Sequence, residues 1–221
     1  QKVFSDVAFN YDLMNDLMSF GAHRLWKKSF IDIVNPSPGD KIIDVGSGSG
    51  DLVQEIQKRD QGLKIDMIDL NKEMLLQGRK RIKNDNVKFY QQNAENLSFL
   101  DNIYDKYLIA FCLRNITDID QSFSEAFRIL KPGGQYYCLE FSQPSSFFIA
   151  NIYSYYKSNI IPALGKIFSK NEDAYNYLNE SIDLFPKQDD LKKRIESAGF
   201  KSVKYINLFD GIVSIHTGYK Y

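Results

Sequence analysis

The feature that most constrains this chain is a glycine-rich segment of seven residues, Asp44-Val45-Gly46-Ser47-Gly48-Ser49-Gly50. It follows the apolar pair Ile42-Ile43 and precedes a helical pattern, so it predicts a strand, a tight loop and the start of a helix. Such a loop directs backbone N–H groups and a helix N-terminus towards a ligand. Its glycines let the main chain approach that ligand without an intervening Cβ. The simpler alternative is a turn that only packs the helix on the strand.

The spacing of these glycines excludes a dinucleotide-binding fingerprint. That fingerprint needs glycine at its first, third and sixth positions, which would be residues 46, 48 and 51, but residue 51 is Asp. The glycines fall at Gly46, Gly48 and Gly50, and Asp51 lies in the first turn of the predicted helix. Because a carboxylate there repels a pyrophosphate, we expect a ligand that is not strongly anionic.

Apolar and amphipathic segments alternate along the chain and predict a doubly wound, mostly parallel α/β sheet. Strands are predicted at 41–45, 64–69, 87–92, 105–113 and 135–142, and helices at 51–59, 72–84 and 119–130, with a stop at residues 131–134. Asp210-Gly211 is a turn signal between the apolar runs Val203–Leu208 and Ile212–Tyr219, which predicts a hairpin. We therefore expect the last strand to be antiparallel, at the edge of the sheet. A length of 221 residues suits one domain, 1–221.

Two further segments are predicted to be helical. Residues 1–34 have helix-like apolar spacing with a break at Gly21 and a second helical run from about Leu25 to Val34, and we expect them to form an N-terminal cap. The aromatic-rich insertion 143–186 is expected to form helices over the carboxyl edge of the sheet, as an apolar lid. The alternative for any one of its aromatic residues is that it fills a core between helix and sheet.

The composition excludes some classes of partner. Lys+Arg and Asp+Glu number 28 each and no basic block is present, so nucleic acid is not favoured. Cys112 and Cys138 lie in apolar, strand-like runs, which indicates reduced core residues without the neighbours of a metal site. No apolar run approaches the ~20 residues of a membrane helix. The chain begins at Gln1, so we expect a trimmed or processed form.

Polar residues follow the predicted strands at the edge where an open parallel sheet binds ligands. Asp69 ends the second strand, 19 residues past Gly50, where a carboxylate can accept hydrogen bonds from two ribose hydroxyls. Asn93-Ala94 follow the third strand and suit an adenine edge, and Arg114-Asn115 follow the fourth, near a reacting centre. Together they predict a nucleoside ligand; the alternative for Asp69 alone is a helix cap.

S-adenosylmethionine fits this loop better than a nucleotide does. Its amino acid part carries an ammonium for carboxylates and a carboxylate for N–H groups, and its sulfonium needs no phosphate cradle. Asp44, at the end of the first strand, is placed to help hold the ammonium. The spacing and strand order thus predict a class I methyltransferase, and they do not distinguish transfer to carbon, oxygen or nitrogen.

Several segments resemble the UbiE family of ubiquinone/menaquinone biosynthesis C-methyltransferases, in order and over essentially the whole chain. These segments are Asp6–Asp16 (DVAFNYDLMND), His23–Lys27 (HRLWK), Phe111–Asp118 (FCLRNITD), Cys138–Ser142 (CLEFS), Tyr177–Ile182 (YLNESI) and Gly211–Lys220 (GIVSIHTGYK). The resemblance implies a Rossmann-like, seven-stranded class I fold. It also implies methyl transfer from S-adenosylmethionine to a ring carbon of a polyprenylated benzoquinol or naphthoquinol, without a metal.

The resemblance also implies roles for particular residues. Ser49, where the family usually has Thr, and Asp69, Asn93 and Ala94 are implied to bind the cofactor, together with Gly46 and Gly48 of the loop. Arg114, Asn115 and Tyr11 are implied to be catalytic. The loop Gly46–Gly50 departs from the more common Ala-Gly-Gly-Thr-Gly, and Ala110 replaces a frequent Ser.

A guanidinium stays protonated at any ordinary pH, so Arg114 is not expected to act as a base. We expect it to stabilise a phenolate, while Asn115 and Tyr11 orient a water that carries the proton away. The two histidines are the rival candidates for the base. His23 is interpreted as a cap or packing residue, and His216, in mid-strand, as structural. Asn207 and the Asp210-Gly211 turn are expected to lie closer to the substrate than His216 does. Lys27 is interpreted as an exposed lysine, with contact to the cofactor carboxylate as the alternative.

A polyprenyl tail predicts peripheral membrane contact through residues 143–170, at the bacterial inner membrane from the cytoplasm or at the mitochondrial matrix face. A homodimer is expected from the resemblance. Two other hypotheses remain open at this point: an O- or N-methyltransferase of a soluble small molecule, and a non-catalytic protein that binds S-adenosylmethionine within a quinone-synthesis complex.

Overall fold

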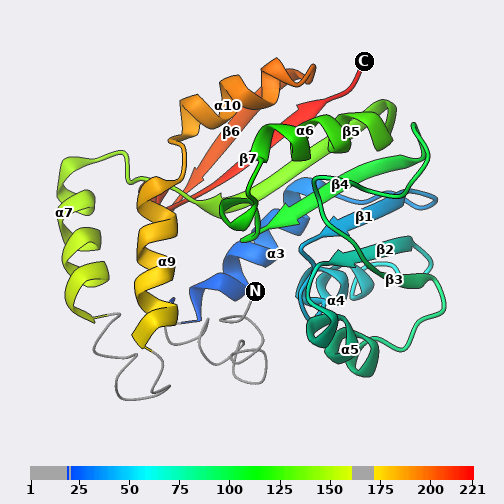
Figure 1. Ribbon diagram of the computed structural model, residues 1–221, viewed down its shortest axis with the longest axis horizontal. Helices are drawn as coiled ribbons and strands as arrows, with labels where there is room; N and C mark the ends of the chain where they lie inside the picture. The colour runs from blue at the N-terminus through cyan, green and yellow to red at the C-terminus, as the bar shows by residue number, and fades with distance from the viewer. Residues whose placement is uncertain (1–18, 20, 161–171) are drawn as a thin grey trace.

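The computed structural model describes residue 19 and residues 21–160 and 172–221 (Figure 1). Within them, seven strands form one sheet. Its strands in spatial order are β3 (Val87–Gln91), β2 (Lys64–Asp69), β1 (Lys41–Val45), β4 (Tyr104–Ala110), β5 (Leu130–Phe141), β7 (Val213–Tyr219) and β6 (Lys201–Leu208). β1 to β5 are parallel, and β7 pairs antiparallel with both β5 and β6. The strand order reverses between β1 and β4, so the loops after these strands diverge at one edge of the sheet.

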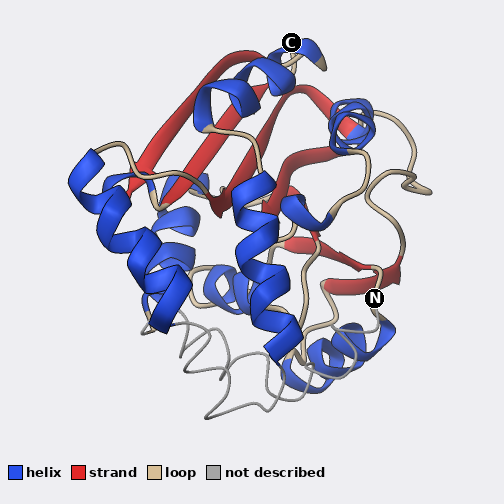
Figure 2. Cartoon of the chain, turned by 60° about the vertical axis from the view of Figure 1, so that its left-hand side comes forward, coloured by secondary structure: helices blue, strands red, loops and turns tan. Residues whose placement is uncertain are grey.

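Helices cover both faces of the sheet (Figures 1 and 2). They are α3 (Ala22–Val34), α4 (Asp51–Gln57), α5 (Lys72–Arg81), α6 (Ile119–Ile129) and α10 (Gln188–Ser197). α3 and α4 bury Phe30 and Ile56 against one face, whereas α6 and α10 bury Phe123 and Ile195 against the other. The predicted doubly wound arrangement is therefore confirmed within the described residues.

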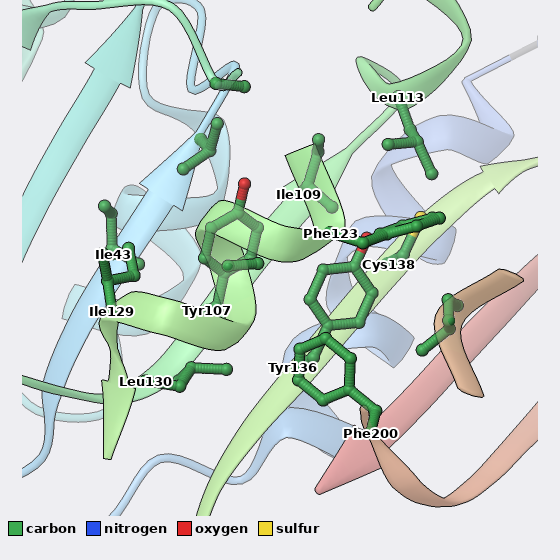
Figure 3. Packing of buried hydrophobic residues seen from close by; sticks show 14 of the residues in the cluster. Ile43, Tyr107, Ile109, Leu113, Phe123, Ile129, Leu130, Tyr136, Cys138 and Phe200 are labelled. Atoms are coloured by element: carbon green, nitrogen blue, oxygen red, sulfur yellow. The ribbon is translucent and has the colours of Figure 1, made fainter. Parts of the chain in front are cut away.

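Aromatic rings fill the core beneath β4 and β5 (Figure 3). Tyr107 and Tyr136 stack with their ring centroids 5.3 Å apart, and the rings of Phe123 and Phe200 lie 5.8 and 5.2 Å from that of Tyr136. Each of these four side chains is at most 1% exposed. Large buried rings contribute much apolar area with few rotamers, so they give the carboxyl ends of these two strands a rigid base.

Two of the predicted strands differ from the structure by three or more residues at one end. β4 ends at Ala110 rather than residue 113, because Phe111 adopts a left-handed φ of 53° and the 3₁₀ turn η1 (Leu113–Asn115) follows. Cys112 consequently lies after the strand, and its predicted place within a strand is wrong. β5 begins at Leu130 rather than 135, because the predicted stop at residues 131–134 is accommodated by a register shift against β4.

The predicted hairpin is confirmed by the antiparallel pair β6 and β7, joined by the 3₁₀ turn η3 (Phe209–Gly211). The last strand does not form the edge, however. β7 lies between β5 and β6, so the preceding strand, β6, is the edge strand. α10, which the sequence analysis did not predict, connects the helical insertion to β6.

The N-terminal cap lies mostly outside the described residues, since residues 1–18 and 20 are not among them. α3 begins at Ala22, three residues before the predicted run, directly after the left-handed Gly21. The insertion 143–186 contains α7 (Phe147–Tyr155), a π-helical turn η2 (Tyr156–Ile160) and α9 (Glu172–Leu184), so it is helical where it is described. Figure 1 shows α7 and α9 beside the sheet, and their role as a lid stays a prediction.

Candidate active site

The glycine loop joins β1 to α4 as predicted, and all three of its glycines have left-handed backbones. Their φ angles are 67° at Gly46, 54° at Gly48 and 92° at Gly50. A Cβ added at Gly46 would lie 2.2 Å from the Sγ of Cys112, so only glycine allows the loops after β1 and β4 to pass this closely. A Cβ at Gly48 would have no atom within 4 Å, because Gly48 borders open space.

Asp69, at the end of β2, fixes this loop from the neighbouring strand. Its Oδ2 accepts a hydrogen bond of 2.8 Å from the Gly48 N–H, and its Oδ1 accepts one of 2.8 Å from the Asn71 N–H. Burial raises the pKa of Asp69, although these backbone N–H groups act to lower it. The side chain of Asn71 caps α5 by accepting from Glu73 and Met74, so the alternative that Asp69 is the helix cap is wrong.

A cavity of about 620 Å³ opens at this edge of the sheet. Five of the six predicted cofactor residues line it: Gly46, Gly48, Asp69, Asn93 and Ala94. Asn115–Thr117 and Tyr177 from α9 line the same cavity. A cleft of a few hundred Å³ is typical of sites for drug-sized ligands, so this cavity is large enough for a nucleoside.

The sixth predicted cofactor residue, Ser49, lies elsewhere. Its hydroxyl accepts a hydrogen bond of 2.5 Å from Nη1 of Arg81, the last residue of α5. It borders a second, smaller cavity of about 50 Å³, together with Asp44, His23 and Lys27. The two cavities share Gly46, Gly48 and Phe111 in their walls, so both border the glycine loop.

Asp51 has strong cationic partners. Its Oδ2 lies 2.6 Å from Nζ of Lys27 and its Oδ1 lies 3.0 Å from Nη2 of Arg81. Burial acts to raise the pKa of Asp51, but the two cations outweigh it and hold that pKa below its usual value. The prediction that Lys27 is exposed is wrong, because its side chain is only 12% exposed and reaches inwards to Asp51.

Asp44 is buried at the end of β1 in the wall of the smaller cavity, with 1% exposure. Neither of its carboxylate oxygens has a hydrogen-bond partner among the described residues. Burial, with the nearby charge of Asp69, raises the pKa of Asp44 to about 8, against a lowering effect of Lys27. An unpartnered carboxylate facing a cavity fits a ligand that carries a cation.

Arg114 follows β4 and is fixed by two neighbouring strand ends. Its Nη1 donates to the Phe111 carbonyl at 2.7 Å and to Oε1 of Glu140, near the end of β5, at 2.8 Å. Its guanidinium lies 5.3 Å from the centre of the Phe141 ring. The Arg114 side chain is 7% exposed and borders the smaller cavity. The left-handed φ of Phe111 contributes here, because it turns the chain away from β4 so that η1 can place Arg114 above the strand ends.

Asn115 borders the larger cavity, so the two adjacent candidates do not face the same space. Its Oδ1 accepts a hydrogen bond of 3.0 Å from the hydroxyl of Tyr177 in α9. Tyr11, the third predicted catalytic residue, lies outside the described residues. The predicted arrangement of Arg114, Asn115 and Tyr11 around one water therefore stays a prediction.

Neither Glu140 nor Tyr177 was predicted from the sequence to be a site residue. The signal for Glu140 was a single charge inside the apolar run Tyr136–Phe141. Tyr177 had no signal beyond its aromatic character and its place in a segment resembling the family.

His216 is structural as interpreted: it is fully buried, its Nε2 lies 2.9 Å from the Gln188 carbonyl, and burial lowers its pKa to about 4.

Asn207 and Asp210 form hydrogen bonds with the two residues that precede α7. In the described part of the chain they border neither cavity. Asp210 accepts from the Ser146 hydroxyl at 2.7 Å, and the Asn207 amide donates to the Ser145 hydroxyl at 3.1 Å. Their expected closeness to substrate stays a prediction. Within the described ranges, no group of three or more His, Cys, Asp or Glu side chains could hold a metal ion.

Substitution of Gly46 and Gly48 by alanine tests the close approach between Gly46 and Cys112. Both residues have a left-handed φ, which costs a non-glycine residue about 1–2 kcal/mol. Gly46→Ala also places a methyl group on Cys112, so it should lower the free energy of unfolding by about 1–3 kcal/mol more than Gly48→Ala does. Urea denaturation of the ligand-free variants measures both, and equal losses would contradict this packing.

The raised pKa of Asp44 predicts a pH-dependent stability. A carboxyl group with a folded-state pKa of about 8 and a model value of 3.8 stabilises the fold while it is protonated. That contribution is lost as the pH rises towards 8, by up to about 1.4 kcal/mol per pH unit. Asp44→Asn removes this dependence, so the melting temperature of the variant relative to wild type should increase between pH 5 and pH 8 in ligand-free protein. A difference that is the same at both pH values would show that Asp44 does not titrate in this window.

Comparison with known proteins agrees with the fold and with the sequence resemblance. The model of the ubiE/COQ5 methyltransferase family matches residues 1–220. The chain is 48% identical, over 99% of its length and 91% of the relative, to the ubiquinone/menaquinone biosynthesis C-methyltransferase UbiE of Rickettsia bellii (strain OSU 85-389). The same identity and coverage hold for the protein of that name from Rickettsia prowazekii (strain Madrid E).

Solved structures share the fold at low sequence identity. A SAM-dependent methyltransferase of Thermotoga maritima, described as a possible histamine N-methyltransferase, is 18% identical with a TM-score of 0.70, over 100% of this chain and 99% of that one. A putative methyltransferase of Haloferax volcanii, in complex with the activator Trm112, is 17% identical with a TM-score of 0.73, over 99% and 96%. The predicted class I methyltransferase fold is thereby confirmed, and with the match along its whole length the chain belongs to the ubiE/COQ5 methyltransferase family.

Proposed function

We propose that this protein transfers a methyl group from S-adenosylmethionine to a ring carbon of a polyprenylated benzoquinol or naphthoquinol, in ubiquinone or menaquinone biosynthesis. The observation that carries this proposal is the 48% identity, over 99% of the chain, to relatives named as C-methyltransferases of that biosynthesis. The two cavities that border the glycine loop support it, because they offer separate places for a nucleoside and for a charged amino acid group.

The residues present fit S-adenosylmethionine. Asp69 borders the larger cavity with lone pairs left for ribose hydroxyls, and Asn93 and Ala94 border the same cavity where an adenine would lie. The unpartnered, buried carboxylate of Asp44 suits the ammonium of the amino acid part. When bound, S-adenosylmethionine supplies an electrophilic methyl group on a sulfonium. Ser49, whose hydroxyl already accepts from Arg81, acts by holding the loop.

Arg114 is the residue best placed to activate the acceptor. A ring carbon becomes a stronger nucleophile when the neighbouring phenolic hydroxyl ionises, and a fixed guanidinium stabilises the resulting phenolate in a site that excludes water. Arg114 cannot accept the proton itself. Asn115, whose carbonyl is fixed by Tyr177, and Tyr11 would orient a water that carries the proton away.

Methyl transfer by the purified protein tests this proposal. With S-adenosylmethionine and a short-tailed demethylquinol kept reduced, we expect a product one methyl group heavier, with the methyl on a ring carbon by NMR. Arg114→Lys should lower kcat by about 100-fold or more while the affinity for S-adenosylhomocysteine stays within about twofold. A methyl on oxygen or nitrogen would favour the other methyltransferase class, and no product with any quinol would favour a non-catalytic role.

Peripheral contact with a membrane is the second part of the proposal. The side chains of Phe147, Phe148, Ile152 and Tyr155 on α7 are between 52% and 83% exposed, and α7 carries no charged residue. Exposed aromatic and aliphatic side chains can bury apolar area in the lipid interface, where a polyprenyl tail resides, although α7 adds no electrostatic attraction to anionic lipids. In the described ranges, no helix has the length and apolarity needed to cross a bilayer. The protein would act from the cytoplasm at the bacterial inner membrane, or at the matrix face in mitochondria; a homodimer stays a prediction.

Flotation with liposomes tests this contact. Wild-type protein should float with vesicles of a neutral and anionic phospholipid mixture, and the pair Phe147→Ser and Phe148→Ser should lower the bound fraction several-fold. Leu100→Ser is the matched control, since Leu100 is 79% exposed on the loop that leads into β4. Equal flotation of all three proteins would place the contact elsewhere, and no flotation of wild type would refute it.

A further inference from the structure

Glu140 is a buried acidic residue whose ion pair contributes little to the stability of the fold. It lies near the carboxyl end of β5, in the run Tyr136–Phe141, and its side chain is 0% exposed. Among the described residues, its hydrogen bonds all lead to the site: Oε1 accepts from Nη1 of Arg114 at 2.8 Å and from the Phe141 N–H at 2.9 Å, and Oε2 accepts from the Arg114 N–H at 3.3 Å. Burying such a pair costs desolvation on both ions, so it is weak as a source of stability.

We propose that Glu140 is a positioning residue for the reaction: it holds the guanidinium of Arg114 in place and sets the net charge that Arg114 presents to the acceptor. This inference rests on the proposed role of Arg114. Full burial prevents Glu140 from contacting substrate, so it acts only through Arg114. The carboxylate, the Phe111 carbonyl and the face of Phe141 fix the guanidinium from three sides.

The charge of the pair matters because the reaction creates an anion beside it. The carboxylate of Glu140 lies 2.8 Å from the Arg114 guanidinium and offsets its positive charge. Without that carboxylate, Arg114 presents a more positive charge to the acceptor, which lowers the pKa of a nearby phenol. Other titratable groups around the pair are Asp44 on β1, Cys112 after β4, Cys138 on β5 and Tyr153 on α7. His23 and Lys27 of α3 and Asp51 of α4 border the same cavity as Arg114.

Glu140→Gln, compared with Glu125→Gln, separates this role from a structural one. Glu125 is also buried and paired with an arginine: it accepts from Nε and Nη2 of Arg128 at 2.8 and 2.9 Å and from the Leu97 N–H at 2.8 Å, away from both cavities. We expect Glu140→Gln to lower kcat by about 10-fold or more. It should also shift the apparent pKa below which kcat falls towards lower pH, by about one pH unit. Glu125→Gln should leave both unchanged, with both variants binding S-adenosylhomocysteine as wild type does by calorimetry.

A nitrophenol probe gives a second readout that does not depend on turnover. Bound beside Arg114 in the presence of S-adenosylhomocysteine, its visible absorbance reports the pKa of the bound phenol. That pKa should be lower in Glu140→Gln than in wild type and in Glu125→Gln. An unmoved pKa and an unmoved pH limb, with a kcat no lower than that of Glu125→Gln, would overturn the proposal.

The double variant Arg114→Gln with Glu140→Gln keeps the test valid if the single variant folds poorly, because it leaves no unpaired buried charge. If Glu140 acts only through Arg114, the double variant has the same kcat as Arg114→Gln alone. A fold-loss in kcat equal to the product of the losses in the two single variants would contradict this. Failure of the proposed function can be told apart from failure of the role proposed for Glu140. In the first case, wild-type protein forms no C-methylated quinol, or Arg114→Gln has an undiminished kcat.

Discussion

Three carboxylates surround the glycine loop, and they differ in how their charge is balanced. Asp51 is neutralised by Lys27 and Arg81, and Asp69 accepts two backbone hydrogen bonds. Asp44, buried between them, has no hydrogen-bond partner among the described residues. A buried carboxylate without a partner is costly when ionised, so the ligand-free site holds a group that a cationic ligand would stabilise. The shape of the loop, the two cavities and the choice of ligand all depend on this arrangement.

The strand order brings these groups together. Because the order reverses between β1 and β4, the loop after β1 and the turn after β4 leave the sheet in different directions and open a space between them. Gly46 lets the two segments touch at Cys112, while Asp69 fixes Gly48 from the other side. The buried rings of Tyr107 and Tyr136 make the bases of β4 and β5 rigid, so that Arg114 and Glu140 are held at defined positions above them.

Much of this arrangement was predictable from local patterns. Alternating apolar runs gave β1 and β2 their exact bounds, and polar residues directly after apolar runs identified Asp44, Asp69 and Asn93 at the ligand-binding edge. What could not be predicted depends on contacts between distant segments. The pairing of Lys27 with Asp51, the anchoring of Arg114 by Glu140 and the hydrogen bond from Tyr177 to Asn115 each join residues that are 24 or more positions apart. The early end of β4 likewise follows from the left-handed φ of Phe111, a conformation that nothing in an apolar run indicates.

The most direct test of this account is the number of protons released when S-adenosylhomocysteine binds, measured by titration calorimetry at pH 7 in buffers of different ionisation enthalpy. At that pH Asp44, with a pKa of about 8, is mostly protonated in the free protein, and an ammonium placed beside it would make it ionise. Wild-type protein should therefore release close to one proton per ligand bound, and Asp44→Asn should release almost none and bind more weakly. Equal proton release and equal affinity in the two proteins would show that the cation of the ligand does not pair with Asp44.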